Sequence, residues 1–366
     1  MKPIKIYSDD IEGGALEQFY SAMEQEFAVK GALLPDAHTG YSLPIGAVVA
    51  TEGVVLPAWV GYDIGCGMCA VRTSLLKHEL HPHRARIFDA MYRVIPTGFH
   101  HNKRPAEWDY QKYPMTPMLK SLFEKNGLSQ LGSMGSGNHF IEISHDEENH
   151  VWVVIHSGSR NLGHSTATHY MKVASKSGKA KEGHYGLRTD SEQGQDYIAD
   201  MRFCLEFALQ NRQEMITRVL REIYNLVREG QTPERLAFIN RTHNHAELKD
   251  GLWIHRKGAT HAEKGMDGVI PGNMRDGSFV VVGKGNEESL NSSSHGAGRS
   301  MSRTKAKNAI NMDKFKAQMK GITSKVAKST LDESPDAYKD IFEVMKLQKD
   351  LVEVTHHLLP IINVKA

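Results

Sequence analysis

The uneven distribution of glycine and histidine is the feature that most constrains how this chain can fold. The 366 residues include 32 glycines and 20 histidines, and most gather in short blocks separated by ordinary helical sequence. The blocks are residues 35–46, 61–68, 132–142, 156–163, 240–247, 255–260, 271–278 and 292–303. No block repeats another at a fixed period, which excludes a solenoid or a propeller. No Pro/Ser-rich linker divides the chain, so we expect one domain over residues 1–366.

The segments around these blocks predict a mixture of helices and strands. Residues 15–29 and 196–228 predict helices, the second from apolar residues at helical spacing. The predicted strands are residues 45–51, 68–74 and 278–282, and two hairpins, 139–144 with 150–156 and 243–247 with 252–256. Because helices and strands are intermixed without βαβ regularity, we predict an α+β fold.

Charge and cysteine content exclude several classes of protein. Lys plus Arg is 45 and Asp plus Glu is 43, so the formal net charge is +2. This value excludes binding to nucleic acid by bulk charge, although it does not exclude a local basic surface. Three cysteines exclude a disulfide scaffold and indicate a reducing compartment. We find no N-terminal targeting pattern and no apolar run of membrane length, so we expect a soluble, cytoplasmic protein without a membrane partner.

The segment from Asp63 to Met68 places a carboxylate and a thiol three residues apart, with Cys66 between two glycines. A mixed oxygen and sulfur set suits Mn, Zn, Fe or Co, but on this segment alone we favour a tight turn around a buried cysteine. Cys66 and Cys69 form a CxxC without a second pair, which is weak evidence for zinc or redox chemistry. We expect Cys69 and Cys204 to pack in the core.

Two histidine-bearing blocks flank the first predicted hairpin. The glycine-rich loop 132–137 can bring backbone N–H groups close to a phosphate, and it ends in Asn138 and His139. It leads into a strand and lacks the Lys-Ser/Thr end of a Walker A loop. His156 ends the hairpin and is followed by Ser157-Gly158-Ser159-Arg160, a pattern that predicts a corner for metal and phosphate.

Three further blocks carry histidines. Strand alternation predicts His243 and His245 on one face of the second hairpin, and we prefer a structural role for His245. The block 255–260 places a histidine, an arginine and a lysine beside a glycine, which predicts a contact with a nucleotide or RNA phosphate. His295 precedes Gly296-Ala297-Gly298, an open backbone on which a histidine can attack phosphorus. Packing alone does not explain this combination.

These motifs resemble those of the RtcB RNA ligases, the tRNA-splicing 3′-phosphate RNA ligases, over nearly the whole chain. The motifs that carry the resemblance are residues 63–68 (DIGCGM), 137–142 (GNHFIE), 156–160 (HSGSR), 255–260 (HRKGAT) and 295–299 (HGAGR). The resemblance implies a fold peculiar to that family, two Mn²⁺ ions and GTP. Cys66 would bridge the ions, with His139 and His156 completing one site and Asp63 and His243 the other.

The resemblance also assigns the nucleotide site. His295 would attack the α-phosphate of GTP and hold GMP, while Glu142, Ser278 and Lys365 would read guanine. The residues expected to bind the nucleotide are Asn138, His139, Phe140, Glu142, His243, Asn244, Pro271, Gly272, Asn273, Met274, Ser278, His295, Gly296, Ala297, Gly298 and Lys365.

The activity implied is the joining of RNA ends that carry a 2′,3′-cyclic phosphate or 3′-phosphate to 5′-hydroxyl ends. Ser42, Ser136 and Asn273 depart from residues common in the family, which fits a short bacterial branch that acts in RNA repair or tRNA splicing. Some of its members are associated with a release-factor-like protein. The alternatives are a metal-dependent phosphodiesterase or cyclic phosphatase acting on RNA ends and a non-catalytic RNA-binding protein.

A cationic stretch along residues 81–104 has two interpretations. Its members are His81, His83, Arg84, Arg86 and Arg93 on one predicted helix, followed by His100, His101, Lys103 and Arg104. They form either a solvated helix face or a track for the RNA backbone, and the sequence does not favour one over the other. The helix-rich segment 311–354 carries no specific signal.

Overall fold

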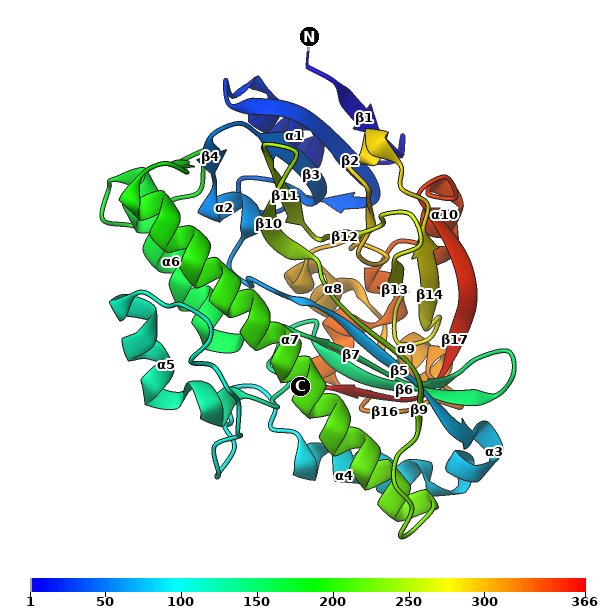
Figure 1. Ribbon diagram of the computed structural model, residues 1–366. Coiled ribbons are helices and arrows are strands. Elements are labelled where there is room, and N and C mark those ends of the chain that lie inside the picture. Colours follow the sequence, from blue (N-terminus) through cyan, green and yellow to red (C-terminus); the bar gives the residue numbers. More distant parts are fainter. Residues whose placement is uncertain (1) are drawn as a thin grey trace.

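The computed structural model describes residues 2–366 and contains two main β-sheets (Figure 1). The first sheet has five strands in the order β1-β2-β3-β11-β10. Their bounds are β1 Ile4–Ile6, β2 Ala28–His38, β3 Ile45–Thr51, β10 Asn244–Lys249 and β11 Leu252–Lys257. Most of β2 and β3 is buried, because α1 (Gly13–Glu24) covers the sheet with Ala15, Phe19, Ala22 and Met23.

The second sheet curves into a nearly closed barrel. Its strands follow the order β13-β14-β17-β6-β7-β5-β9, and β16 pairs with β17 beside this path. The bounds are β5 Gly67–Leu76, β6 Phe140–His145, β7 His150–Ser157, β9 Arg235–Thr242, β13 Asp267–Pro271, β14 Ser278–Gly283, β16 Thr323–Ser324 and β17 Val352–Lys365. The two end strands, β9 and β13, lie side by side and are joined by an ion pair between Arg241 and Asp267. The remaining strands form two small two-stranded sheets. One pairs β4 (Val54–Val55) with β8 (Leu187–Arg188), and the other pairs β12 (Ala259–His261) with β15 (Ser292–Ser294).

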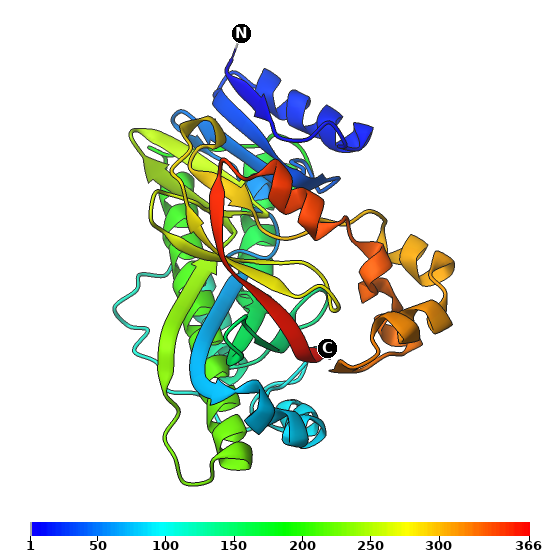
Figure 2. The same cartoon turned by 90° about the vertical axis from the view of Figure 1, so that its right-hand side faces the viewer.

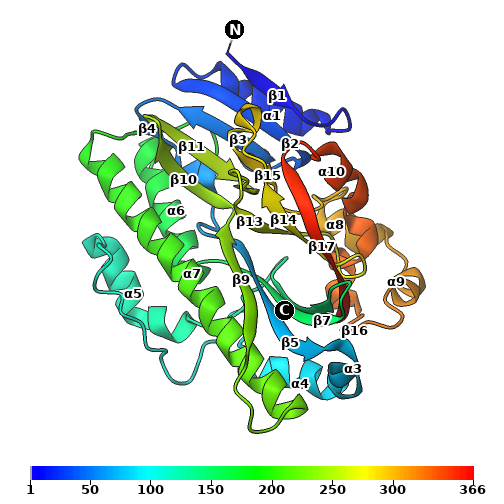
Figure 3. The same cartoon turned by 45° about the vertical axis from the view of Figure 1, so that its right-hand side comes forward.

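Helices cover one flank of the barrel. The longest, α7 (Glu192–Val227), runs diagonally across the molecule beside β9 (Figures 1 and 3). The others are α2 Pro57–Val60, α3 Lys77–Leu80, α4 Arg84–Val94, α5 Pro117–Gln130, α6 Arg160–Ser175, α8 Arg303–Ala309, α9 Met312–Gln318 and α10 Ile341–Leu347. Figure 2 shows α8 and α9, in orange, projecting as an arm from the body of the molecule. None of the described helices is long and apolar enough to cross a membrane.

The structure confirms both predicted hairpins, as β6–β7 and β10–β11, and the strand over residues 45–51. The helix predicted over residues 15–29 is wrong at its C-terminal end, because α1 stops at Glu24 and residues from Ala28 onward pair with β3. Sheet pairing overrides local helix propensity there. The helix predicted over residues 81–93 begins with a 3₁₀ turn, His81–His83, before α4. Mixed helices and sheets agree with an α+β fold, and one domain over residues 1–366 stays a prediction.

Two buried polar residues on α7 hold the loops at one end of the barrel. The side-chain oxygen of Asn211 accepts hydrogen bonds from the backbone N–H groups of Gly132 and Ser133, at 2.7 and 3.1 Å. Its amide nitrogen donates to Ser133, to Ser157 Oγ and to the carbonyl of Gly158. Asn211 thereby replaces backbone pairing that these loops lack, and it satisfies groups that have no water around them.

Replacing Asn211 with alanine should leave these buried donors and acceptors without hydrogen-bond partners. Each unsatisfied buried group costs about 1–3 kcal/mol, so we expect Asn211→Ala to lower the free energy of unfolding by about 2–4 kcal/mol in urea denaturation. Asn225→Ala is the matched control, since Asn225 lies exposed on the same helix and should change stability by less than about 0.5 kcal/mol. Equal losses in both variants would contradict this role for Asn211.

Candidate functional site

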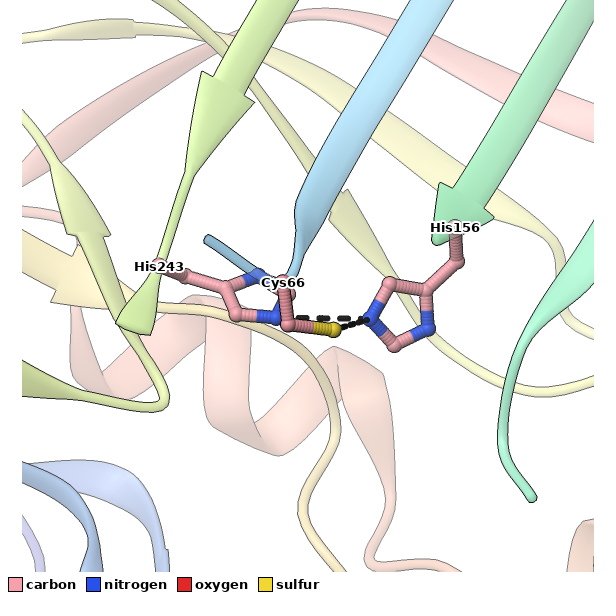
Figure 4. A group of neighbouring side chains, drawn as sticks. All are labelled: Cys66, His156 and His243. Carbon is pink, nitrogen blue, oxygen red and sulfur yellow. Dashed lines mark hydrogen bonds between the residues drawn. The ribbon is translucent and has the colours of Figure 1, made fainter. Parts of the chain in front are cut away.

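Four strand ends meet at one edge of the barrel and bring four site residues together. Strands β6, β7, β5 and β9 are neighbours in antiparallel pairs, and Gly67 lies opposite both Ser157 and Thr242. Cys66 therefore precedes β5 at the edge where His156 ends β7, and His243 follows β9 there (Figure 4). His139 reaches the same edge because it directly precedes β6. Gly67 is required for this approach, since a Cβ would lie 2.1 Å from the carbonyl oxygen of Arg241.

The five expected metal ligands converge on the thiol of Cys66. Its Sγ lies 3.1 Å from His156 Nε2 and 3.4 Å from His139 Nε2. His156 Nε2 lies 3.3 Å from His243 Nε2, and His139 Nε2 lies 3.0 Å from Asp63 Oδ2. The ligand atoms form two groups that share Cys66, one with His156 and His243 and one with Asp63 and His139. The resemblance instead pairs His139 with His156 at one ion and Asp63 with His243 at the other. The assignment of ligands to each ion therefore stays a prediction.

Hydrogen bonds on the far side of two imidazole rings fix which nitrogen faces the cluster. His139 Nδ1 lies 2.9 Å from the carbonyl oxygen of Met134, and His156 Nδ1 lies 3.3 Å from that of Asn138. A carbonyl can only accept, so each Nδ1 donates to its carbonyl and the Nε2 of each ring faces Cys66. This arrangement, with the outer N–H held by a backbone carbonyl, is typical of metal-ligating histidines.

The electrostatics of the cluster favour a bound cation. Burial lowers the pKa of both His156 and His243 well below the ordinary value, which keeps the rings neutral as ligands. Burial, and then the nearby Asp63 carboxylate, raises the pKa of the Cys66 thiol. Burial opposes ionisation of Asp63 as well, but hydrogen bonding to His139 and Cys66 lowers its pKa overall. A set of sulfur, nitrogen and carboxylate oxygen donors with facing lone pairs fits a borderline divalent cation.

A cavity of about 310 Å³ opens beside this cluster and is lined by most of the residues expected to bind a nucleotide. Its volume falls within the range of small-molecule sites. The expected residues in its lining are Asn138, Phe140, Glu142, Pro271, Gly272, Asn273, Met274, His295, Gly296, Ala297, Gly298 and Lys365. Four others lie outside the lining. His139 and His243 belong to the metal cluster, Asn244 bonds to Asp63 and Gly258, and Ser278 lies behind Glu142.

His295 is held by a buried carboxylate that our sequence analysis did not identify. Asp36 Oδ2 lies 2.6 Å from His295 Nδ1 and 3.2 Å from its backbone nitrogen. Asp36 is fully buried on β2, and its other oxygen has no partner among the described residues. In this pairing Nδ1 donates to the carboxylate, and Nε2 makes no contact with Asp36. The only signal in the sequence was the position of Asp36 in a histidine-bearing block.

The far end of the cavity is built around Glu142. Its carboxylate accepts hydrogen bonds from Ser144, Ser278 and Asn363 at 2.8, 3.1 and 3.3 Å. Burial raises the pKa of Glu142 to about 7, even though these hydrogen bonds and Lys365 oppose the shift.

Lys365 lies beside this carboxylate and makes contacts of its own. Its ammonium donates to Glu333 at 2.6 Å and lies 4.9 Å from the centre of the Phe140 ring. Burial opposes ionisation of Glu333, but Lys365 and then Arg303 lower its pKa to about 2. Glu333 and Asn363 are further residues that the sequence analysis missed.

Two sequence interpretations are wrong, and a third, the phosphate-binding loop, stays a prediction. The N–H groups of Gly132 and Ser133 bind Asn211, whereas Asn138 at the end of that loop lines the cavity. His243 and His245 do not share a face, because His243 lies in a bend before β10 and the His245 ring stacks on His261. The block 255–257 contacts no nucleotide pocket, since all three side chains are buried with partners inside the protein. Cys69 and Cys204 pack in the core as predicted.

The pKa of Glu142 predicts a pH-dependent loss of stability. The folded protein keeps this carboxyl protonated up to about pH 7, whereas the unfolded chain ionises near its ordinary value of 4.5. Its contribution to the free energy of unfolding is therefore complete below pH 4.5 and falls as pH rises through 7. Urea denaturation at pH 5 and pH 8 should show wild type losing on the order of 3 kcal/mol relative to Glu142→Gln. Glu229→Gln, at an exposed position, should have the same free energy of unfolding as wild type at both pH values.

The convergence on Cys66 predicts how the cluster binds metal. Cys66→Ser replaces the shared sulfur with a weaker oxygen donor, so Mn²⁺ affinity measured by electron paramagnetic resonance should fall at least about tenfold. Co²⁺ bound to wild type should show a thiolate-to-metal charge-transfer band that the variant lacks. Cys69→Ser is the control, because Cys69 lies in the core and should leave that band unchanged. A band that survives in Cys66→Ser would exclude Cys66 as a ligand.

Comparison with known proteins gives one consistent family. The family model described as tRNA-splicing ligase RtcB matches residues 18–121 and 112–366. The RNA-splicing ligase RtcB of Escherichia coli (strain K12) is 34% identical over 403 residues, with 99% of this chain and 97% of that protein covered. The tRNA-splicing ligase RtcB of Thermococcus kodakarensis is 30% identical, covering 94% and 90%. The RNA-splicing ligase RtcB homolog 1 of Entamoeba dispar is 29% identical, covering 92% and 79%.

These similarities extend over both sheets and over every strand end that meets at Cys66. They agree with the motifs at residues 63–68, 137–142, 156–160 and 295–299. The chain belongs to the RtcB family.

Proposed function

We propose that this protein is a GTP- and manganese-dependent RNA ligase. It joins RNA ends that carry a 2′,3′-cyclic phosphate or a 3′-phosphate to 5′-hydroxyl ends, through a histidine–GMP intermediate. The observation that carries the proposal is the pairing of His295 with Asp36 in a cavity next to a cluster of five metal-ligating side chains. The names of the matched relatives, which describe RNA-splicing and tRNA-splicing ligases, support the same reaction class.

In the first step GTP is a substrate, since the reaction consumes it. His295 Nε2 attacks the α-phosphorus, a nitrogen–phosphorus bond forms, the bond to the bridging oxygen breaks and pyrophosphate leaves. The ring becomes positively charged as it reacts, and Asp36 stabilises that charge through Nδ1–H, 2.6 Å away. The ring of His243 lies 4.9 Å from the ring of His295, which places the nucleophile directly beside the metal cluster.

The later steps transfer and then release GMP. Water first opens a cyclic phosphate to a 3′-phosphate. An oxygen of that phosphate attacks the phosphorus held by His295, the nitrogen–phosphorus bond breaks, and His295 is regenerated. The 5′-hydroxyl of the second RNA then attacks the activated RNA phosphorus, loses its proton to solvent, and GMP leaves as a 3′–5′ phosphodiester forms. Positioning and charge neutralisation supply most of the catalysis in such phosphoryl transfers.

Asp63, Cys66, His139, His156 and His243 are the proposed ligands of two Mn²⁺ ions, and their donor atoms fit that role. Bound manganese would neutralise charge on the reacting phosphoryl groups and orient them. The protein contributes fixed donors, because α7 and the strand ends hold the ligand-bearing loops before any metal arrives.

Selection of guanine is proposed to depend on Glu142. An ionised carboxylate can accept both the N1–H and the N2–H of guanine, whereas adenine offers no equivalent pair of donors. Lys365 lies against Phe140 and Glu333 in the same cavity, so its positive charge favours the ionised form of Glu142.

An RNA substrate is consistent with the charge of the arm. Residues 299–328 hold nine Lys and Arg residues and one acidic residue, a charge of +8 in a chain of net charge +2. Seven of these cations are exposed lysines, at positions 305, 307, 314, 316, 320, 325 and 328. These lysines lie on α8, on α9 and on the segment that follows, and three of them form ion pairs with Asp313, Asp332 and Asp336. The others provide the local basic surface that phosphate backbones require. We place the enzyme in the cytoplasm, in RNA repair or tRNA splicing, with a release-factor-like protein as the proposed partner.

The test is formation of a covalent adduct. Purified protein incubated with Mn²⁺ and GTP labelled at the α-phosphate should become labelled in an acid-labile bond, which denaturing electrophoresis detects. His295→Ala should abolish labelling, because it removes the attacking nitrogen. A label that persists in this variant would exclude His295 as the nucleophile.

Asp36→Asn serves as a graded second variant. It keeps the size of the side chain but removes the charge that stabilises the reacting imidazole, so we expect the labelling rate to fall by about 100-fold. Thermal melting should show that both variants are folded. If wild type opens cyclic phosphates without ever forming an adduct, the protein is a metal-dependent phosphodiesterase, the alternative reading of the same cluster.

A further inference from the structure

A second hollow reaches the metal cluster independently of the nucleotide cavity. It has a volume of about 540 Å³ and includes Asp63 and His139 in its lining, whereas the nucleotide cavity meets the cluster through His156. No residue lines both hollows. A ligase that uses one cavity for a nucleotide needs another approach to the same cluster for an RNA end, and this hollow provides one.

The rim of this hollow carries Phe99, whose side chain has almost no protein contact. It is 94% exposed, the highest value among the large apolar side chains of the described residues, and the next is Tyr41 at 58%. Ordinary surfaces include single apolar side chains, but a phenylalanine with almost no contacts, beside a metal cluster, indicates a binding site.

The backbone around Phe99 is fixed even though the ring is free. Gly98 donates to the carbonyl of Gly135 at 2.7 Å, and its own carbonyl accepts from the guanidinium of Arg160 at 2.7 Å. Gly98 has φ +60°, a conformation that favours glycine. His100 N–H closes a turn onto Thr97 at 3.1 Å. The loop therefore fixes the backbone that carries Phe99, and binding has to order only the ring.

The surroundings of Phe99 indicate a nucleic acid. His100, His101, Lys103 and Arg104 follow it in sequence, all exposed and without an ion pair among residues 2–366. The lining of the hollow behind the ring includes the amide side chains of Asn126, Gln130 and Asn161 and the guanidinium of Arg160, beside apolar surface. An RNA end offers a flat base for the ring, ribose hydroxyls for the amides and phosphates for the cations.

We propose that Phe99 is a stacking platform for the terminal nucleobase of the single-stranded RNA end that carries the 3′-phosphate. The base stacks on the exposed ring, the sugar and phosphate enter the hollow toward Asp63 and His139, and the strand leaves past Lys103 and Arg104. Every base has a flat face, so this contact strengthens binding without reading sequence. The inference rests on the proposed RNA ligase function and extends it to the position of one substrate.

The test uses a short RNA with 2-aminopurine as its last nucleotide before the 3′-phosphate. Stacking quenches this base, so wild type should quench its fluorescence on binding. Phe99→Ala should lose the quenching and weaken RNA binding by about fivefold or more, whereas Phe99→Trp should retain both. Phe238→Ala is the matched control, an exposed aromatic on β9, and should behave as wild type. The side chain of Phe99 is exposed, so its removal should leave folding and labelling by GTP unchanged.

The outcomes separate this inference from the proposed function. If Phe99→Ala is labelled by GTP and binds and quenches the RNA as wild type does, the stacking role is wrong. Quenching by wild type of a 5′-terminal 2-aminopurine but not of the 3′-terminal one would overturn the assignment to the 3′-phosphate end. If wild type is never labelled by GTP, the proposed function fails, while the binding measurements still decide whether Phe99 stacks on RNA.

Discussion

The structure depends on a concentration of lone pairs around Cys66. Three imidazole nitrogens, a thiol and a carboxylate lie within a few ångströms of one another, and two of the rings turn Nε2 toward the sulfur. Such a group is repulsive unless a proton or a cation lies among its atoms. Burial removes the water that could reduce this repulsion and keeps the His156 and His243 imidazoles neutral. A cation bound among these donor atoms would be attracted by all of them.

An arrangement of this kind needs a rigid frame, and α7 provides one. Arg212, fully buried on that helix, donates 2.8 Å hydrogen bonds to the carbonyls of Gly65 and Ser157, each next to a proposed metal ligand. Burial lowers the pKa of this guanidinium to about 10, so it stays charged at neutral pH behind the cluster. Its neighbour Asn211 fixes the loop before His139. Two adjacent residues thus orient three ligand-bearing segments and place a permanent positive charge near the thiol.

The sequence predicted the residues at the centre of the site better than the residues that hold them in place, for a physical reason. Cys66, His139, His156 and His243 lie at or next to strand ends, and their motifs carry the resemblance that predicts them as metal ligands. Asp36 and Glu333 carry no such signal, because each acts through a partner far away in sequence, His295 and Lys365. Local patterns also misplaced residues whose burial is decided by the sheets, such as the block 255–257. Strand positions were predictable, whereas the closing of one sheet into a barrel depends on β9 meeting β13 and is not encoded locally.

The two hollows beside the cluster differ in the chemical groups that they present. The nucleotide cavity is lined by His156, by the His295 ring that pairs with Asp36 and by the buried carboxylate of Glu142, which is proposed to discriminate among bases. The other hollow presents an unpaired aromatic ring, followed in sequence by exposed cations, and these groups are proposed to bind a strand without reading its sequence. The proposed ligase would need this asymmetry, because it would accept many RNA ends but only one nucleotide. The cluster meets one hollow through His156 and the other through Asp63 and His139, so both proposed substrates would bring phosphate to the same atoms.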